Sequence, residues 1–431
     1  MNPLLISGFG TSIYVEKRKL VICNKLENTF QEFHPHKIDH DGIIIDGHTG
    51  NISFEAMRWM MKHNINMVLL NWNGNLLANT LPDQPKSGKL RIRQYEKYLD
   101  DNYRFEIASK ITQTKVEHSL NLLLELSRYY DSIDMPRITQ SVKRERQFLL
   151  KITPKNQHLG MKIKGKNLRS ESSNQIKKLM TYEGRIAEVC LSQITSIYNE
   201  LYPEFHFTGR KDKTNSRNYN ASDEINALLN YGYAILESEI RKSLNAIGLD
   251  YAVGFLHEIN QSKTPLVYDI QELFRWIIDL SVIQLLEEKK IKKSDFITTE
   301  NYHIRLKEKT AKMLIEKIRK NFNHKKKYKN NKKFSYQNIL QDNLQQLANF
   351  ISGKKKDFEF DIPKITIQRN DDVQIREKIL NMTPQQRKLS GINKSTLWYL
   401  KSNLTKGKKV MIYDKIKTKL ENGMPNVSPK A

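Results

Sequence analysis

Cysteine is scarce in this sequence, because only Cys23 and Cys190 occur among its 431 residues. Two such distant cysteines form neither a metal-spaced cluster nor a disulfide framework. Long apolar runs are missing as well, and no stretch approaches the ~20 residues that a membrane span requires. The first residues contain a short apolar stretch with no basic segment before it, unlike a signal peptide. We therefore expect a cytoplasmic protein with no membrane partner.

Acidic residues are outnumbered, since 47 Asp and Glu stand against 72 Lys and Arg, for a formal net charge of +25. A surplus of this size creates a positive field that attracts polyanions. Nucleic acid is the first candidate partner, and an anionic membrane surface is the weaker second one. The hydrophobic content of 39% is enough for real cores, and the length predicts roughly two to four domains.

Residues 1–87 predict a small β-rich domain that contains one helix. Short apolar, β-branched runs such as 42–45 and 67–70 are typical of strands. Ser53 is a candidate N-cap, because the residues that follow it place their apolar side chains on one helical face.

Helical periodicity dominates residues 88–323 and predicts a large all-α domain. The lysine-rich segment 324–362 is expected to be a basic linker around one helix at 336–351. Tyrosine and phenylalanine interleave with its lysines, which is typical of an arm that follows a DNA backbone. The alternative for these lysines is ordinary solvated charge.

The last part, residues 363–431, has the signals of a helix-turn-helix domain. Thr383 is an N-cap followed by proline, Gly391 lies in a tight turn, and Asn393 caps a further helix. The N-terminal residues of such a recognition helix reach base edges or phosphates. The alternative is a plain helical bundle with Leu397, Trp398 and Leu400 in its core. The candidate DNA-binding residues are Lys394, Ser395, Thr396, Trp398, Tyr399 and Lys401. The expected fold class is α+β, with a β-rich, an all-α and a helix-turn-helix part.

Carboxylates and one imidazole supply the candidate chemistry. Asp269 and Glu272 are three residues apart on an expected helix, so both can face one point. With His257 and Glu183 they form a donor set that suits Mn²⁺ or Mg²⁺. Such an ion neutralises phosphate charge and activates an oxygen nucleophile.

Each of these residues also has a structural interpretation. Glu183 can be a helix-start charge favoured by the helix dipole, and His257 a hydrogen-bonded core histidine. Asp269 can be an N-cap with Glu272 as its capping-box partner. Spacing alone leaves both interpretations open.

Several motifs in their order along the chain resemble the CRISPR-associated spacer integrase family. They are the run 226–233 (NALLNYGY), residues 248–250 (GLD), 254–257 (GFLH) and 269–275 (DIQELFR), with the upstream 182–184 (YEG). The resemblance covers roughly residues 1–322. It implies an N-terminal β domain and a helical catalytic domain that usually dimerises.

The resemblance implies specific roles. Glu183, His257 and Glu272 correspond to the metal ligands, and Asp269 to a close acidic helper in the catalytic set. Arg275, about one turn after Glu272, is placed to meet a DNA phosphate.

Two departures from the family pattern stand beside the motifs. Residues 218–222 occupy the place of a common proline pair, so the loop before the NALLNYGY run is expected to differ. Leu273 stands where a proline often follows the second helix acid. Neither change touches a proposed ligand.

The tail favours one branch of the family. Casposases are mobile-element transposases with the same catalytic fold, and many carry added DNA-binding domains. The resemblance therefore implies an enzyme that joins 3′-hydroxyl ends of element DNA to a target duplex by transesterification. It would act as a homo-oligomer, a dimer or tetramer, on the terminal repeats and target DNA.

Three alternatives remain open at this point. A CRISPR integrase and endonuclease would need a small bridging subunit and repeat DNA. A simple nuclease would use water in place of the 3′-hydroxyl. A non-catalytic architectural DNA-binding protein would keep the carboxylates for structure.

Two weaker patterns have mostly structural explanations. The segment 160–166 has P-loop-like glycines, but Asn167 stands where Mg²⁺ binding needs Ser or Thr, so we interpret it as a basic loop near DNA. His34, His36 and His40 have zinc-like spacing without cysteine, and a solvated loop is the favoured explanation.

Overall fold

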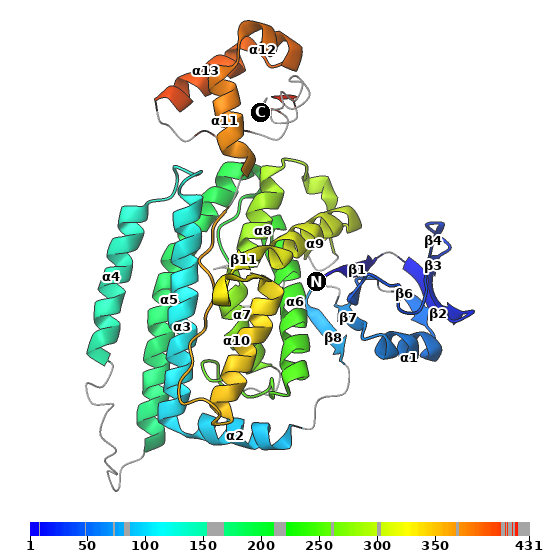
Figure 1. The fold of residues 1–431 in the computed structure, drawn as a ribbon, viewed down its shortest axis with the longest axis vertical. Coiled ribbons are helices and arrows are strands. Elements are labelled where there is room, and N and C mark those ends of the chain that lie inside the picture. Colours follow the sequence, from blue (N-terminus) through cyan, green and yellow to red (C-terminus); the bar gives the residue numbers. More distant parts are fainter. Residues whose placement is uncertain are drawn as a thin grey trace.

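The computed structural model describes the chain except for residues 8, 48, 72–73, 82–86, 153–167, 211–220, 260–262, 300–302, 368–369, 407–409, 411, 413–415, 417–418 and 421–431. Its fold is mixed α+β, as predicted: an N-terminal sheet region lies beside a large helical body, and three helices lie beyond one end of that body (Figure 1).

The N-terminal part is built from two four-stranded sheets and one helix. One sheet has the order β1-β5-β7-β8 and the other β4-β3-β2-β6. The Ser53 hydroxyl accepts a hydrogen bond from the Ala56 amide at 3.1 Å, so the predicted N-cap is confirmed. The elements are Pro3–Ile6 (β1), Phe9–Glu16 (β2), Lys19–Asn24 (β3), Thr29–Phe33 (β4), Gly42–Ile45 (β5), Thr49–Ile52 (β6), Phe54–Lys62 (α1), Asn66–Leu70 (β7) and Leu76–Thr80 (β8).

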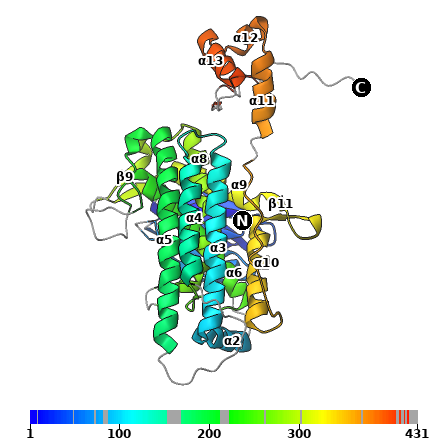
Figure 2. The ribbon, with the colours of Figure 1, turned by 90° about the vertical axis from the view of Figure 1, so that its left-hand side faces the viewer.

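Long helices form the body, with α3, α4 and α5 running side by side (Figure 2). Helices α7 and α8 are buried among them because most residues of both are apolar. The elements are Gly88–Leu99 (α2), Asp101–Leu126 (α3), Met135–Ile152 (α4), Leu168–Leu201 (α5), Pro203–Phe205 (η1), Glu224–Ile247 (α6), Pro265–Phe274 (α7), Trp276–Glu287 (α8), Lys293–Asp295 (η2), Phe296–Thr298 (β9), Ile304–Leu306 (β10) and Glu308–Asn323 (α9). The antiparallel β9–β10 pair is a small exception to the predicted all-α character.

The expected basic linker is instead part of the helical body. The predicted helix is present as α10, and its apolar side is buried in the same core as α6 and α9. Residues 353–367, here called the strap, form no helix or strand, and from Phe358 onward their apolar side chains mostly alternate with polar ones. Five of these apolar residues are buried on that core. Segment 324–362 is rich in lysine, but its apolar residues decide its packing. The elements are Lys325–Lys327 (β11), Lys329–Asn331 (η3), Lys333–Ser335 (β12) and Tyr336–Ile351 (α10).

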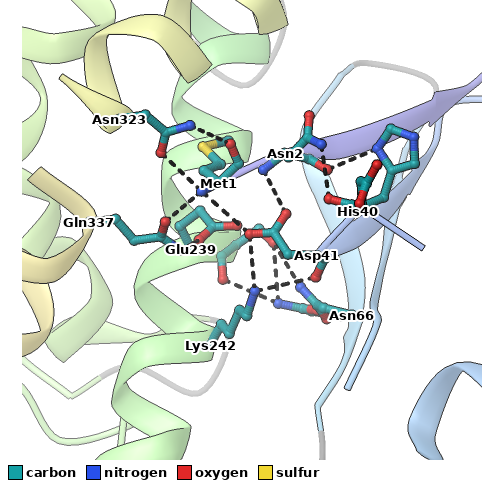
Figure 3. Close-up of polar contacts among 12 residues, drawn as sticks. Met1, Asn2, His40, Asp41, Asn66, Glu239, Lys242, Asn323 and Gln337 are labelled. Atoms are coloured by element: carbon teal, nitrogen blue, oxygen red, sulfur yellow. Dashed lines mark hydrogen bonds and ion pairs between the residues drawn. The ribbon is translucent and has the colours of Figure 1, made fainter. Parts of the chain in front are cut away.

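A partly buried polar cluster joins the β domain to the helical body (Figure 3). The α-amino group of Met1 donates to the side-chain oxygen of Asn323 at 3.0 Å and lies 3.5 Å from Asp41. Lys242 from α6 approaches the same Asp41 carboxylate at 3.6 Å. A second contact is the 2.7 Å ion pair between Asp46 and Arg305. The β domain and the helical body, whose boundary in the sequence lies at about residue 87, are therefore joined by an interface of paired charges.

The C-terminal helices have a small core of their own, separate from that of the body. They are Asn370–Asn381 (α11), Pro384–Ser390 (α12) and Lys394–Thr405 (α13), and the last two begin directly after Thr383 and Asn393, as the sequence predicts. Thr383 and Gln386 form a capping box, and Gly391 ends α12 with φ 63°, in the left-handed region that favours glycine. Asn393 caps α13. In the part of the chain that the structure describes, no helix is both long and apolar enough to cross a membrane.

Candidate active site and metal centre

His257 and Glu272 line a cleft of about 660 Å³, and Glu183 is joined to Glu272 through the ammonium group of Lys115. Helix α7 contributes Glu272, α5 contributes Glu183, and the loop between α6 and α7 contributes His257. Aromatic and basic side chains complete the wall, as expected for a cleft that receives an anionic polymer. The cleft-lining residues used below are Arg210, Tyr233, His257, Glu272 and Arg275.

Asp269 organises the loop that carries His257. One carboxylate oxygen, Oδ2, accepts the backbone amides of Phe255 and Leu256 at 2.5 and 3.0 Å. The other, Oδ1, accepts the His257 amide at 3.0 Å. Asp269 is fully buried in the middle of α7, which begins at Pro265. The interpretation of Asp269 as an N-cap is therefore wrong, and its carboxylate instead holds a separate segment of chain.

Gly254 lets this loop approach α7. A Cβ at this position would lie 2.7 Å from the Pro265 backbone and 2.9 Å from Asp269 Oδ2. Real Cβ atoms almost never come so close, so any side chain here would push the loop off its carboxylate. This contact explains the glycine at the start of the GFLH motif.

One ring nitrogen of His257 is hydrogen-bonded to Asp269. Its Nδ1 lies 2.8 Å from Asp269 Oδ1, which leaves Nε2 as the nitrogen available to a ligand. Burial lowers the pKa of His257, but the hydrogen bond and charge of Asp269 outweigh it, and the pKa is raised overall. A carboxylate behind the imidazole is the arrangement that orients metal-binding histidines.

Glu183 and Glu272 converge on one cation, the ammonium group of Lys115 from α3. Lys115 Nζ is hydrogen-bonded to Glu183 Oε1 and lies 2.6 Å from Glu272 Oε2. Burial would raise the pKa of Glu272, but the charges of Arg275 and Lys115 outweigh it and lower the pKa to about 2. Both carboxylates therefore lie within reach of a single positive charge.

Arg275 contacts both carboxylate oxygens of Glu272. Its guanidinium is 3.2 Å from Glu272 Oε1, donates to the Tyr233 hydroxyl at 3.2 Å, and lies 4.7 Å from the centre of that ring. Tyr233 in turn donates to Asp279 at 2.7 Å. Arg275 also lines the cleft, as expected for a phosphate-binding residue, although its contact with phosphate stays a proposal.

Arg210 was not predicted from the sequence. Its guanidinium donates to the side-chain oxygens of Asn226 and Asn230 at 2.9 and 2.8 Å. These are the two asparagines of the NALLNYGY run, four residues apart on one face of α6. Two asparagine side chains on one helical face indicate that a polar group binds there. The sequence does not indicate which residue supplies that group.

The donor set suits a divalent cation, although it does not enclose one as the side chains stand. Two carboxylates and a free imidazole nitrogen are appropriate ligands for Mn²⁺ or Mg²⁺. Among the described residues, no three His, Cys, Asp or Glu side chains converge closely enough to hold an ion. The Lys115 ammonium lies between two of the three proposed ligands.

The proposed DNA-binding residues of α13 differ in their exposure and in their contacts. Trp398 and Tyr399 are 72% and 58% exposed, so the alternative of a core Trp398 is wrong, whereas Leu397 and Leu400 are buried. Lys394 and Ser395 are exposed at the start of the helix, and Thr396 is half-buried. Lys401 donates to the Met382 carbonyl at 2.8 Å, so its ammonium supports the helix packing.

The weaker sequence patterns do not add a site. The loop at 160–166 lies outside the described residues. His40 is bonded to the Asn2 carbonyl, and in the described part of the chain these histidines do not gather into a group of three that could hold a metal ion. Tyr336 is buried in the core, which removes it from the expected DNA-tracking arm.

A family model for CRISPR associated protein Cas1 matches residues 4–320. The CRISPR-associated endonuclease Cas1 1 of Archaeoglobus fulgidus is 24% identical over 356 residues, which are 82% of this chain and 97% of the relative. The CRISPR-associated endonuclease Cas1 of Korarchaeum cryptofilum is 28% identical over 290 residues, 66% of this chain and 77% of the relative. The chain belongs to the Cas1 family of DNA integrases and endonucleases.

The fold of this chain is also similar to those of solved structures. A casposase bound to integration product has a TM-score of 0.73 and 34% identity, covering 89% of this chain and 99% of that one. A Cas1 protein from Thermotoga maritima, at 16% identity and a TM-score of 0.61, covers 82% of this chain and 97% of that one and supports the fold alone. The resemblance to casposases, expected from the motifs together with the C-terminal tail, is confirmed.

Proposed function

We propose that this protein is a casposase-type integrase that joins 3′-hydroxyl ends of DNA to a target duplex in a reaction dependent on Mn²⁺ or Mg²⁺. The observation that supports it most is the Asp269-held His257 beside two carboxylates that share one cation position. A purely architectural protein has no need for this arrangement, in which one buried carboxylate accepts four hydrogen bonds to aim an imidazole at a cleft.

The reaction proposed is a transesterification. The 3′-oxygen of one strand forms a new bond to phosphorus, and the bond from that phosphorus to the leaving 3′-oxygen of the target strand breaks. The nucleophile loses its proton and the leaving oxygen gains one, so no external energy source is required. Glu183, His257 and Glu272 would hold the divalent cation, which supplies charge neutralisation at the reacting phosphate. Arg275 would position that phosphate, and Asp269 keeps His257 in the tautomer that leaves Nε2 free.

The partners follow from the reaction. Two ends of one element must be joined, so at least two copies of the site are needed, and a homodimer or homotetramer on double-stranded DNA is proposed. The α11–α13 unit would recognise terminal repeats through the exposed residues at the start of α13. The casposase proposal is favoured over a CRISPR integrase by the 34% identity to a casposase. A CRISPR integrase would instead need a small bridging subunit.

Strand joining is tested with a labelled 3′-hydroxyl oligonucleotide and a supercoiled plasmid in Mn²⁺ or Mg²⁺. Glu183→Ala, His257→Ala and Glu272→Ala are each expected to abolish joined product and to keep DNA binding in a gel shift. The matched control is Glu188→Ala, because Glu188 is an exposed acid on the same helix α5. Joining by any of the three variants at the control level removes that residue from the site. Cleavage without joined product would instead favour the simple nuclease.

A further inference from the structure

The proposed metal site assigns no role to Lys115. It projects from α3 between α5 and α7 and pairs with a carboxylate from each of those helices. Its side chain is only 11% exposed, so this is a built interior contact. An ammonium group buried to this degree is costly unless it is paired, and both of its carboxylate partners here are proposed metal ligands.

The ammonium occupies the position between the two carboxylates that a shared metal ion would take. Ligand oxygens lie about 2.0–2.1 Å from a bound Mg²⁺, and Lys115 Nζ is 2.6 Å from Glu272 Oε2. An ion that bridges the same two oxygens would therefore have to displace the ammonium. Without a cation between them, Glu272 would keep its pair with Arg275, but the charge that Glu183 and Glu272 share would be gone.

A second cavity next to the site offers the ammonium a different position. It has a volume of about 120 Å³ and is bordered by Lys115, Tyr198 and Asp279. Among the described residues the Tyr198 hydroxyl is buried and has no hydrogen-bond partner. Asp279 supplies a half-buried carboxylate there, which also accepts the Tyr233 hydroxyl. The wall also carries Arg210, Arg275 and several apolar side chains. Tyr198 and Asp279 are the polar partners that we assign to a displaced Lys115 ammonium.

We propose that Lys115 is an internal counter-cation that keeps Glu183 and Glu272 together in the metal-free protein, and that a divalent ion binds by displacing its ammonium group. This inference rests on the proposed metal dependence of the same site. As a consequence, the Lys115 ammonium lowers the affinity of the site for a divalent ion in the absence of DNA. An ion that displaces Lys115 leaves both carboxylates free to turn toward His257.

The test is Mn²⁺ binding to the full-length protein without DNA, measured by isothermal titration calorimetry. Lys115→Met is expected to bind Mn²⁺ about tenfold more tightly than the wild type, because a competing charge worth on the order of one ion-pair interaction is gone. Its melting temperature without metal is expected to fall, and the rise on adding Mn²⁺ to exceed that of the wild type. Lys115→Arg retains a cation and is expected to keep the weaker affinity.

The matched control is Lys110→Met. Lys110 lies on the same helix, is 13% exposed and pairs with Glu106 and Asp357 away from the cleft. It is expected to lose stability without a change in Mn²⁺ affinity. If methionine at 115 prevents folding, Lys115→Gln provides the same neutral comparison.

Equal or weaker Mn²⁺ binding by the neutral Lys115 variants overturns the inference and leaves the proposed function intact. If the wild type and these variants all fail to bind Mn²⁺, the inference and the proposed metal centre are both wrong.

Discussion

The strap and the α11–α13 unit are neighbours in sequence but belong to different cores. The strap buries Phe358, Phe360 and three isoleucines on the helical body. The three C-terminal helices bury their apolar residues among themselves. Lys110 from α3 pairs with Asp357 at the start of the strap, whereas Lys401 of α13 bonds to Met382 within its own unit. A basic composition therefore does not separate a linker from a structural element, because the apolar residues decide where each segment packs.

The largest expected effect is a difference in stability between two truncated chains, one ending after the strap and one ending before it. A chain ending at residue 367 is expected to fold, to bind Mn²⁺ and to join DNA ends without preference for terminal repeats. A chain ending at 352 loses five buried apolar side chains at about 1.5–3 kcal/mol each, which is comparable to a whole domain's stability. Circular dichroism and urea unfolding measure both. Equal stability of the two truncated chains would contradict the assignment of the strap to the core.

Leu397→Ala tests the independence of the C-terminal core. Leu397 is buried in it, so the substitution is expected to destabilise that unit by about 2–5 kcal/mol. Limited proteolysis in urea, read by mass spectrometry, is expected to show earlier cleavage in residues 370–405 and an unchanged body. Simultaneous loss of protection in α3 would mean that the two cores unfold together.

The pH dependence of the interface between β domain and body comes from Asp46. Burial raises its pKa from 3.8 to about 6, against the lowering effect of its ion pair with Arg305. Between these values the folded protein keeps a proton that the unfolded chain has lost. The stabilisation from this group is thus complete below about pH 4 and is lost as the pH rises through 6, by about 3 kcal/mol.

Urea unfolding of the wild type and Asp46→Asn from pH 4 to 7.5 measures this effect. The stability of the wild type relative to the variant is expected to decline over that range. Parallel pH curves for the two proteins would rule out Asp46 as the titrating group.

Asp269→Asn is expected to lower strand joining by about 10- to 100-fold, the usual range for a residue that orients a metal-binding histidine. The amide keeps the size of the side chain but loses the charge that accepts four hydrogen bonds. Gel-shift binding to terminal repeats is expected to stay unchanged, because the α11–α13 unit is separate. Asp357→Asn, at a carboxylate that is 72% exposed, is the control. Unchanged joining would show that the loop holds His257 without this carboxylate.

Trp398→Ala is expected to have the smallest effect on stability, within about 0.5 kcal/mol, because the side chain is 72% exposed. Binding to terminal repeats is nevertheless expected to weaken relative to random duplex. Competition gel shifts with both DNAs measure this ratio. A change equal for both DNAs would assign Trp398 to general backbone contact.

Local signals carried the prediction of individual elements. The caps at Ser53, Thr383 and Asn393 each operate within a few residues, and all three helices begin where these residues predict. The helix at 336–351 was predicted with its observed bounds. The motifs around Glu183, His257 and Glu272 identified the family without any structure.

Tertiary structure alone decided how these residues act. Lys115 lies 68 positions from Glu183 on another helix, and no local pattern distinguishes it from the other 71 Lys and Arg residues. The role of Asp269 depends on three backbone amides of a loop 12 to 14 positions away. Sequence determines helix starts and apolar faces because those depend on neighbours in the chain. The pairing of charges depends on which faces meet, and only the packed fold brings α3, α5 and α7 together around one cation position.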